Sequence, residues 1–203
     1  MGEKSTRERI VDAADRLFYE RGYEPTSFAD IANAVEISRG NFYHHFKSKD
    51  DILHAVIELR LEKTRGMLEA WERQGARPEE RIRSFIRILI TNEALIRQYG
   101  CPVGTLCTEL AKLGHASRAE ASALFTLFRT WLRRQFELLG HEADADPLAL
   151  HVLARSQGVA VLFNAFGDPC FVRQEVDQIC TWLSSLAARP RRSRKSQERP
   201  SST

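Results

Sequence analysis

The 203-residue sequence lacks several features that define common protein classes. Its uninterrupted apolar runs stay short of the roughly 18 residues that a membrane-spanning helix needs, and Met1 to Arg7 lack the apolar stretch of a signal peptide. We therefore expect a soluble, cytoplasmic protein that has no membrane partner. Gly-rich phosphate loops, His-Glu-x-x-His and Gly-x-Ser-x-Gly are also missing, so an enzyme is not expected.

Cysteine is scarce as well, because only four are present and they lack the dense spacing of a disulfide scaffold. We expect reduced thiols and, since no tight Cys pair suits Zn, neither a metal nor another cofactor. Cys101 and Cys107 lie in a bend ahead of a helix N-terminus, a position that can lower the pKa of a thiol. Two hypotheses stay open: a redox- or electrophile-sensing switch in which Cys107 resolves a sulfenate on Cys101, and two inert, small apolar side chains.

The chain also lacks a uniformly basic character. Thirty Lys and Arg stand against 27 Asp and Glu, a net charge of +3, and residues 189–203 alone hold six basic residues and one acid, a net of +5. The remaining 24 basic and 26 acidic residues give residues 1–188 a net charge of −2. Any DNA binding must therefore use a small local surface. The tail is predicted to be disordered, and to serve as a non-specific DNA-affinity aid or as an inert solubilising end.

What the sequence does contain is helical periodicity. Apolar residues recur at three- and four-residue spacing, and strand-like alternation is not found, which predicts an all-α fold of about nine helices. Ser27 with Asp30, and Ser48 with Asp51, form capping boxes that begin two of the helices. We predict an N-terminal three-helix domain at residues 6–66, a larger helical domain at 67–188 and the basic tail at 189–203.

Two short helices near the N-terminus carry the strongest functional signal. A four-residue turn from Glu36 separates the helix capped by Ser27 from one capped by Ser38, and these are the dimensions of a helix-turn-helix. The second helix has the sequence Ser38-Arg-Gly-Asn-Phe-Tyr-His-His-Phe46. Together with Gly22-Tyr23, Ile31-Ala32, Lys49 and Leu53, this sequence resembles the DNA-binding domain of tetracycline-repressor (TetR) family regulators over about residues 6–66.

The resemblance implies an all-helical homodimer. Its N-terminal helix-turn-helix domain would bind double-stranded DNA at a palindromic operator, and would release it when a small-molecule effector enters the C-terminal ligand-binding and dimerisation domain. We therefore expect a ligand-responsive transcriptional regulator and favour a repressor. A helical adaptor that uses its tail to bind partners, or an enzyme, is the alternative from a different class.

The residue types of the second short helix suit DNA. Arg39 offers a fork that matches guanine O6 and N7, Asn41 can bond base edges, and Gly40 lets the backbone approach the duplex. Phe42 and Phe46, four residues apart, should be buried. For each candidate taken singly, an ordinary cap, a solvated charge or a core histidine is the alternative. The remaining candidates for contacts with phosphates or base edges are Ser27, Ser38, Tyr43, His44, His45 and Lys49.

Two positions depart from the pattern of the family. Family members usually carry Gly in the turn where this chain has Glu36, and a positive φ is unfavourable for a residue other than Gly. We therefore expect a slightly strained turn. Phe28 stands where family members often have a small polar residue that contacts phosphate, so one backbone contact is expected to be missing.

Aromatic residues in the C-terminal region are candidates for a ligand pocket, which we predict among the helices of residues 78–139. Core packing is the alternative for each of these aromatic residues. The candidates are Phe85, Phe125, Phe128 and Trp131 as lining residues, with Asn92, Glu93 and Asn164 as polar orienting groups.

Broad apolar faces on the helix of residues 146–166 and on the last helix predict a dimer interface. Ser156, Gly158 and Ala160 are small enough to allow close approach of helices there. The alternative is that these faces only cover the core of their own protomer.

Overall fold

The computed structural model describes residues 4–75 and 77–188, which form ten α-helices and no strand. The all-α prediction is confirmed. One helix more than the expected number of about nine arises because the segment from Pro78 to Gly100 is divided at Asn92, where the backbone leaves helical geometry (φ −105°, ψ 21°). The basic tail at 189–203 lies outside the described residues.

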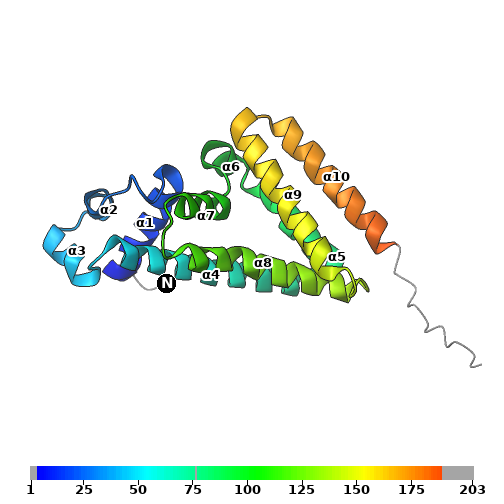
Figure 1. The fold of residues 1–203 in the computed structure, drawn as a ribbon, viewed down its shortest axis with the longest axis horizontal. Helices are drawn as coiled ribbons and strands as arrows, with labels where there is room; N and C mark the ends of the chain where they lie inside the picture. Colours follow the sequence, from blue (N-terminus) through cyan, green and yellow to red (C-terminus); the bar gives the residue numbers. More distant parts are fainter. Residues whose placement is uncertain (1–3, 76, 189–203) are drawn as a thin grey trace, which may run out of the picture.

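The first three helices form the N-terminal end of the molecule, at the left of Figure 1. They are α1 (Thr6–Arg21), α2 (Phe28–Val35) and α3 (Arg39–His45). The predicted caps are confirmed, because the Ser27 hydroxyl accepts from the Asp30 N–H at the start of α2 and the Ser48 hydroxyl from the Asp51 N–H at the start of α4 (Lys49–Gln74). Local sequence therefore sets where these helices begin.

The long helix α4 connects two hydrophobic cores. Its first half packs against α1 and places Ile52, Leu53 and Val56 in the core of the N-terminal helices. Its second half packs against α5 and α8, where Met67 and Leu68 join the larger core. A single rigid element thus runs from one core into the other, while the division of the chain into domains at residue 66 stays a prediction.

The C-terminal helices surround the larger core. In Figure 1, α9 and α10 run side by side on the outer side of the molecule. Helix α8 packs against α4 and α9, and α10 packs against α5 and α9. The bounds of these helices are α5 (Pro78–Thr91), α6 (Glu93–Tyr99), α7 (Pro102–Lys112), α8 (Arg118–Leu138), α9 (Ala145–Phe166) and α10 (Pro169–Ala187).

Helix α9 has one face in the core and one in solvent. Val152, Val159 and Phe163 are buried, whereas Val161 and Phe166 are 65% and 72% exposed. By length and composition alone α9 could cross a membrane, and it is the one such helix among the described residues. Its core contacts with α8, α6 and α5 show how the fold uses this apolar sequence.

The small residues of α9 are arranged differently from the prediction. Gly158 is exposed, but Ser156 and Ala160 are buried inside the protomer. These two side chains therefore face the core instead of an interface, because the helical period places them on the same side as Val152 and Val159.

The turn between α2 and α3 contains the expected positive φ. Glu36 has φ 58° and ψ 45°, in the left-handed region, and it is the sole non-Gly residue with a positive φ in the described part of the chain. Its N–H donates to the Asn33 carbonyl at 3.2 Å and so ends α2. The Cβ atom of a non-Gly residue is strained in this left-handed conformation, and Gly would avoid that strain.

Replacing Glu36 with Gly is expected to raise the free energy of unfolding by about 0.5–1 kcal/mol, because relief of the left-handed strain exceeds the added entropy of the unfolded chain. Urea denaturation of the two proteins measures the difference. Ala34→Gly, at an exposed position inside α2, is the matched control and should lose about 1 kcal/mol. Equal destabilisation by both substitutions would contradict the assignment of strain to Glu36.

Candidate nucleic-acid interface and ligand cavity

Helix α3 presents its first turn to solvent. The Ser38 hydroxyl accepts from the Asn41 N–H at 3.3 Å and caps the helix. The side chains of Arg39 and Asn41 are exposed, and a Cβ added to Gly40 would meet nothing within 4 Å. The start of this helix is therefore open to close approach by a nucleic-acid duplex, whose major groove is wide enough to take an α-helix.

Aromatic packing holds α3 from behind. Phe42 and Phe46 are buried as predicted, at 1% and 3% exposure. The ring of Phe28 lies 5.2 Å from that of Phe42 and 5.5 Å from that of Tyr43, between ring centroids. At the position where a phosphate contact was expected to be missing, Phe28 instead packs against α3. It supports the helix that carries the candidate base-reading residues.

Two of the cations near α3 are bonded within the protein. The Lys49 ammonium donates to the carbonyls of Tyr23 (3.1 Å) and Glu24 (3.0 Å) and lies 4.3 Å from the centre of the Tyr23 ring. The Lys47 ammonium donates to the Tyr43 carbonyl at 2.6 Å. A phosphate contact by Lys49 therefore requires its side chain to leave these carbonyls, whereas Arg39 is already exposed.

All nine predicted DNA-contacting residues lie at this end of the molecule, on α2, α3, α4 and their caps. The imidazole rings of His44 and His45 lie 5.4 Å apart, and the Ser27 hydroxyl bonds to the Asp30 carboxylate. His45 and Lys49 are half-buried. The other seven are exposed: Ser27, Ser38, Arg39, Gly40, Asn41, Tyr43 and His44.

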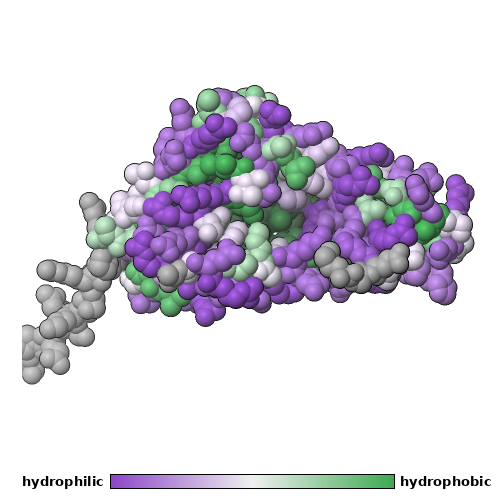
Figure 2. All heavy atoms as spheres, turned by 180° about the vertical axis from the view of Figure 1, so that it is seen from behind, coloured by the Kyte–Doolittle hydropathy of each residue, from purple (hydrophilic) through white to green (hydrophobic). Residues whose placement is uncertain are grey.

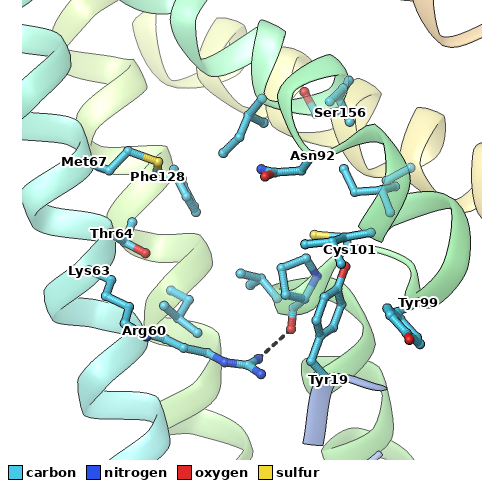
Figure 3. Close-up of a pocket in the computed structure, with 18 of the residues that line it drawn as sticks. Tyr19, Arg60, Lys63, Thr64, Met67, Asn92, Tyr99, Cys101, Phe128 and Ser156 are labelled. Atoms are coloured by element: carbon cyan, nitrogen blue, oxygen red, sulfur yellow. Dashed lines mark hydrogen bonds between the residues drawn. The ribbon is translucent and has the colours of Figure 1, made fainter. Parts of the chain in front are cut away.

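A buried arginine joins this end to the rest of the molecule. Arg60 of α4 is only 8% exposed. Its Nε donates to Asp15 Oδ1 of α1 at 2.6 Å and its Nη1 to the Pro102 carbonyl at the start of α7 at 2.7 Å, the bond drawn in Figure 3. Three helices are thus held by one desolvated guanidinium.

Further bonds tie α1 and the turn after it to the segment around α7. The Tyr19 hydroxyl donates to the Gly100 carbonyl at 2.7 Å, and burial raises the pKa of Tyr19 to about 12, which keeps the group a neutral donor. The Glu109 carboxylate accepts from the backbone N–H groups of Tyr23 (2.9 Å) and Glu24 (2.8 Å). The position of α1 therefore depends on where α7 lies.

A polar cluster makes a similar connection at the start of α4. The Tyr23 hydroxyl donates to Asp50 Oδ1 at 2.5 Å, and this bond lowers the pKa of the Asp50 carboxyl. His115 Nε2, after α7, lies 3.4 Å from the same oxygen, and His54 is paired with Glu120 of α8. These contacts join the helix-turn-helix end to α7 and α8.

A cavity of about 510 Å³ lies next to the Arg60 contacts, between the N-terminal helices and the C-terminal core. Figure 3 shows α4 on one side of it, with Asn92 and Cys101 on the other. Figure 2 shows hydrophobic side chains gathered near the middle of one face of the molecule among hydrophilic ones. The size suits a drug-sized organic molecule. Its apolar wall includes Met67, Phe85, Leu89, Leu124, Phe128 and Leu153.

The structure separates the seven predicted ligand residues into two groups. Phe85, Asn92, Phe125 and Phe128 line the cavity. Trp131 lies outside it, with its ring centroid 5.7 Å from that of Trp71. Asn164 also lies outside, because its Nδ2 donates to the Arg97 carbonyl at 3.0 Å, beside a smaller cavity. Glu93 lies outside the cavity wall, 3.7 Å from the Arg173 guanidinium.

Several lining residues were missed because they lie outside residues 78–139. They come from α1, α4 and α9, and include Tyr19, Arg60, Lys63 and Ser156. The sequence contains one signal for them. Arg60 follows Val56 by four residues on the buried side of α4, and a charged residue at a core position requires a partner or a function.

The redox switch at Cys101 and Cys107 stays a prediction, because the folded structure holds the two thiols apart. All four are free thiols. Cys101 lines the cavity and accepts a bond from Gln157 Nε2 at 3.5 Å, while burial raises the pKa of the Cys107 thiol. A six-residue separation along a helix places their Cα atoms about 9 Å apart, beyond the roughly 7 Å that a disulfide tolerates. Among the residues with described placement, no group of three His, Cys, Asp or Glu is positioned to hold a metal.

Replacing Arg60 with Leu is expected to lower the free energy of unfolding by about 3 kcal/mol, because the Asp15 carboxylate and the Pro102 carbonyl lose a buried partner. Chemical denaturation measures the loss. Arg129→Leu is the control, since it breaks an exposed pair with Asp146 and should cost about 0.2–1 kcal/mol. If the two variants lose the same free energy, Arg60 does not have the structural role described.

The sequence and the fold are both similar to those of known transcriptional regulators. The family model "Bacterial regulatory proteins, tetR family" matches residues 10–56. The transcriptional regulator AcuR of Cereibacter sphaeroides is 32% identical in sequence, over 70% of this chain and 67% of AcuR. The HTH-type transcriptional repressor DhaR of Mycobacterium sp. is 30% identical, over 66% of this chain and 65% of DhaR. A crystal structure of a TetR transcriptional regulator from Legionella pneumophila superposes with a TM-score of 0.76 at 28% identity, over 88% of this chain and 99% of that one.

Proposed function

Because the chain belongs to the TetR family of helix-turn-helix transcriptional regulators, we propose that it is a cytoplasmic repressor that binds a palindromic operator as a homodimer and releases it when a small molecule enters the cavity. The observation that carries this proposal is that α1 and α4 both support the helix-turn-helix and line the cavity. A molecule in the cavity therefore touches the helices that position the DNA-binding end. The relative DhaR, named a repressor, favours repression over activation.

For DNA binding, α3 enters the major groove with its first turn foremost. Arg39 and Asn41 contact base edges, since both side chains are exposed. Ser27, Ser38, Tyr43, His44 and His45 contact phosphates or neighbouring base edges, and Lys49 joins them by rotating away from the carbonyls that it now bonds. The Gly40 backbone approaches the duplex closely because no side chain intervenes.

The dimer forms through the outer faces of α9 and α10. Helix α9 exposes Leu150, Val161, Leu162 and Phe166, which are large apolar side chains on one helix. Several exposed large apolar side chains on one helix favour a protein interface there. Two-fold symmetry then places the two α3 helices about one turn of DNA apart, roughly 34–36 Å. A palindromic operator follows from that symmetry.

Release requires that the effector binds better to a state in which the DNA-binding ends have moved. The bonds from Arg60 and Tyr19 run beside the cavity and connect α1 to the segment between α6 and α7. An effector that shifts this segment shifts α1 and, through it, α3. A hundredfold preference for the released state supplies about 2.7 kcal/mol of coupling free energy, which is enough for a switch.

Selection of bound sequences from random duplexes, followed by anisotropy titrations, tests DNA reading. Arg39→Ala is expected to cost about 1–3 kcal/mol on the selected operator and to relax the preference at one base position. Arg133→Ala, an exposed residue of α8, is the control that should bind like the wild type. The proposal fails if no sequence is enriched, or if Arg39→Ala binds selected and scrambled duplexes as the wild type does.

The dimer has its own test. Val161→Asp and Phe166→Asp together are expected to convert the protein to a monomer in light scattering, since two charges would be buried unpaired. Leu113→Asp, at an exposed leucine at the end of α7, should leave the dimer intact. A double variant that remains dimeric would place the interface elsewhere.

A further inference from the structure

One buried hydroxyl on the cavity wall has no hydrogen-bond partner. Ser156 of α9 is 3% exposed, and its Oγ has no partner in the described part of the protein. Among the described residues, the only other buried side-chain nitrogen or oxygen in this state is Trp131 Nε1, which belongs to a residue outside the cavity wall. A buried hydroxyl is normally bonded, because leaving it unpaired costs free energy. The orphan atom therefore marks a place where a ligand can bond.

Asn92 adds a second polar group to the same cavity. Its side chain does not cap α6, and Figure 3 shows it reaching into the cavity. A carboxamide can donate and accept, as a hydroxyl can. The surrounding wall is apolar, with Phe85, Phe128 and Leu153 among its residues. The cavity thus combines an apolar surface with two polar groups, each of which can bond a small polar atom of a ligand.

The charged groups of the cavity do not favour an ion. Three acids and three bases line its other end, so their charges sum to zero: Asp12, Asp15, Glu20, Arg16, Arg60 and Lys63. Arg60 is already paired with Asp15, and Lys63 lies 3.6 Å from Asp12. The third base, Arg16, is exposed to solvent. An ionised ligand would therefore lose its hydration without gaining a buried, unpaired counter-charge.

We infer that the effector is an uncharged, mainly apolar compound with a hydroxyl or carbonyl group that hydrogen-bonds Ser156. This inference rests on the proposed function, because it names the chemical class that the effector cavity takes. It assigns Ser156 as the residue that selects for a polar atom on an apolar body.

Three probes with the same two-ring body test the class: naphthalene, 2-naphthol and 2-naphthoate. Calorimetric titration of the full chain without DNA, at neutral pH, is expected to give 2-naphthol an affinity about fivefold above that of naphthalene, or about 1 kcal/mol, as one net hydrogen bond provides. The anion 2-naphthoate should bind more weakly than either. Tighter binding of 2-naphthoate than of 2-naphthol, or no binding of any probe, overturns the inference.

Ser156→Ala separates recognition from folding. It should remove the preference for 2-naphthol while leaving the naphthalene affinity unchanged, and the Tm of the free protein should stay the same or rise, since the lost oxygen had no protein partner. Ser84→Ala is the matched control, because the Ser84 hydroxyl bonds the Glu80 carbonyl outside the cavity and should not affect either probe. A preference that survives Ser156→Ala overturns the assignment.

The two proposals fail separately. A protein that binds its selected operator but shows no preference for the uncharged hydroxyl probe contradicts only the effector class. A protein that discriminates the probes through Ser156 but binds no DNA sequence contradicts the regulatory function and leaves the cavity chemistry intact.

Discussion

The buried Arg60 guanidinium is the interaction on which the relative placement of the two ends of the protein depends. It bonds Asp15 of α1 and the Pro102 carbonyl of α7 from the middle of α4. A desolvated cation cannot give up its partners without a large penalty. The helix-turn-helix therefore cannot turn about α4 on its own, and the position of α3 is coupled to the shape of the cavity wall.

The free energy of the Arg60 contact is large enough for a ligand to act through it. Loss of a buried ion pair costs about 3–5 kcal/mol, whereas allosteric coupling is typically about 1–3 kcal/mol. A ligand next to Arg60 thus needs to weaken the contact only in part to redistribute two states. The cavity wall combines apolar side chains with the unpaired Ser156 hydroxyl. Under the proposed function, the former would provide affinity for the effector and the latter selectivity.

Features of the chain that depend on neighbours in sequence were predictable, and those that depend on packing were not. The caps at Ser27 and Ser48 and the left-handed Glu36 follow from local rules. Whether an aromatic side chain lines a void or fills the core depends on where distant helices meet. Phe128 lines the cavity, whereas Trp131 packs against Trp71 outside it. The orientation of Lys49 also required the structure, because its carbonyl partners lie 25 and 26 residues earlier.

The open first turn of α3 has a consequence for how such a protein diversifies. Arg39 and Asn41 are exposed, and the core beneath them is built from Phe28, Phe42 and Phe46. New side chains at positions 39 and 41 therefore have little to disturb in the fold. Under the proposed function, exchanging these two surface residues would change the DNA sequence that the protein binds and would leave the cavity, and with it the effector, unchanged.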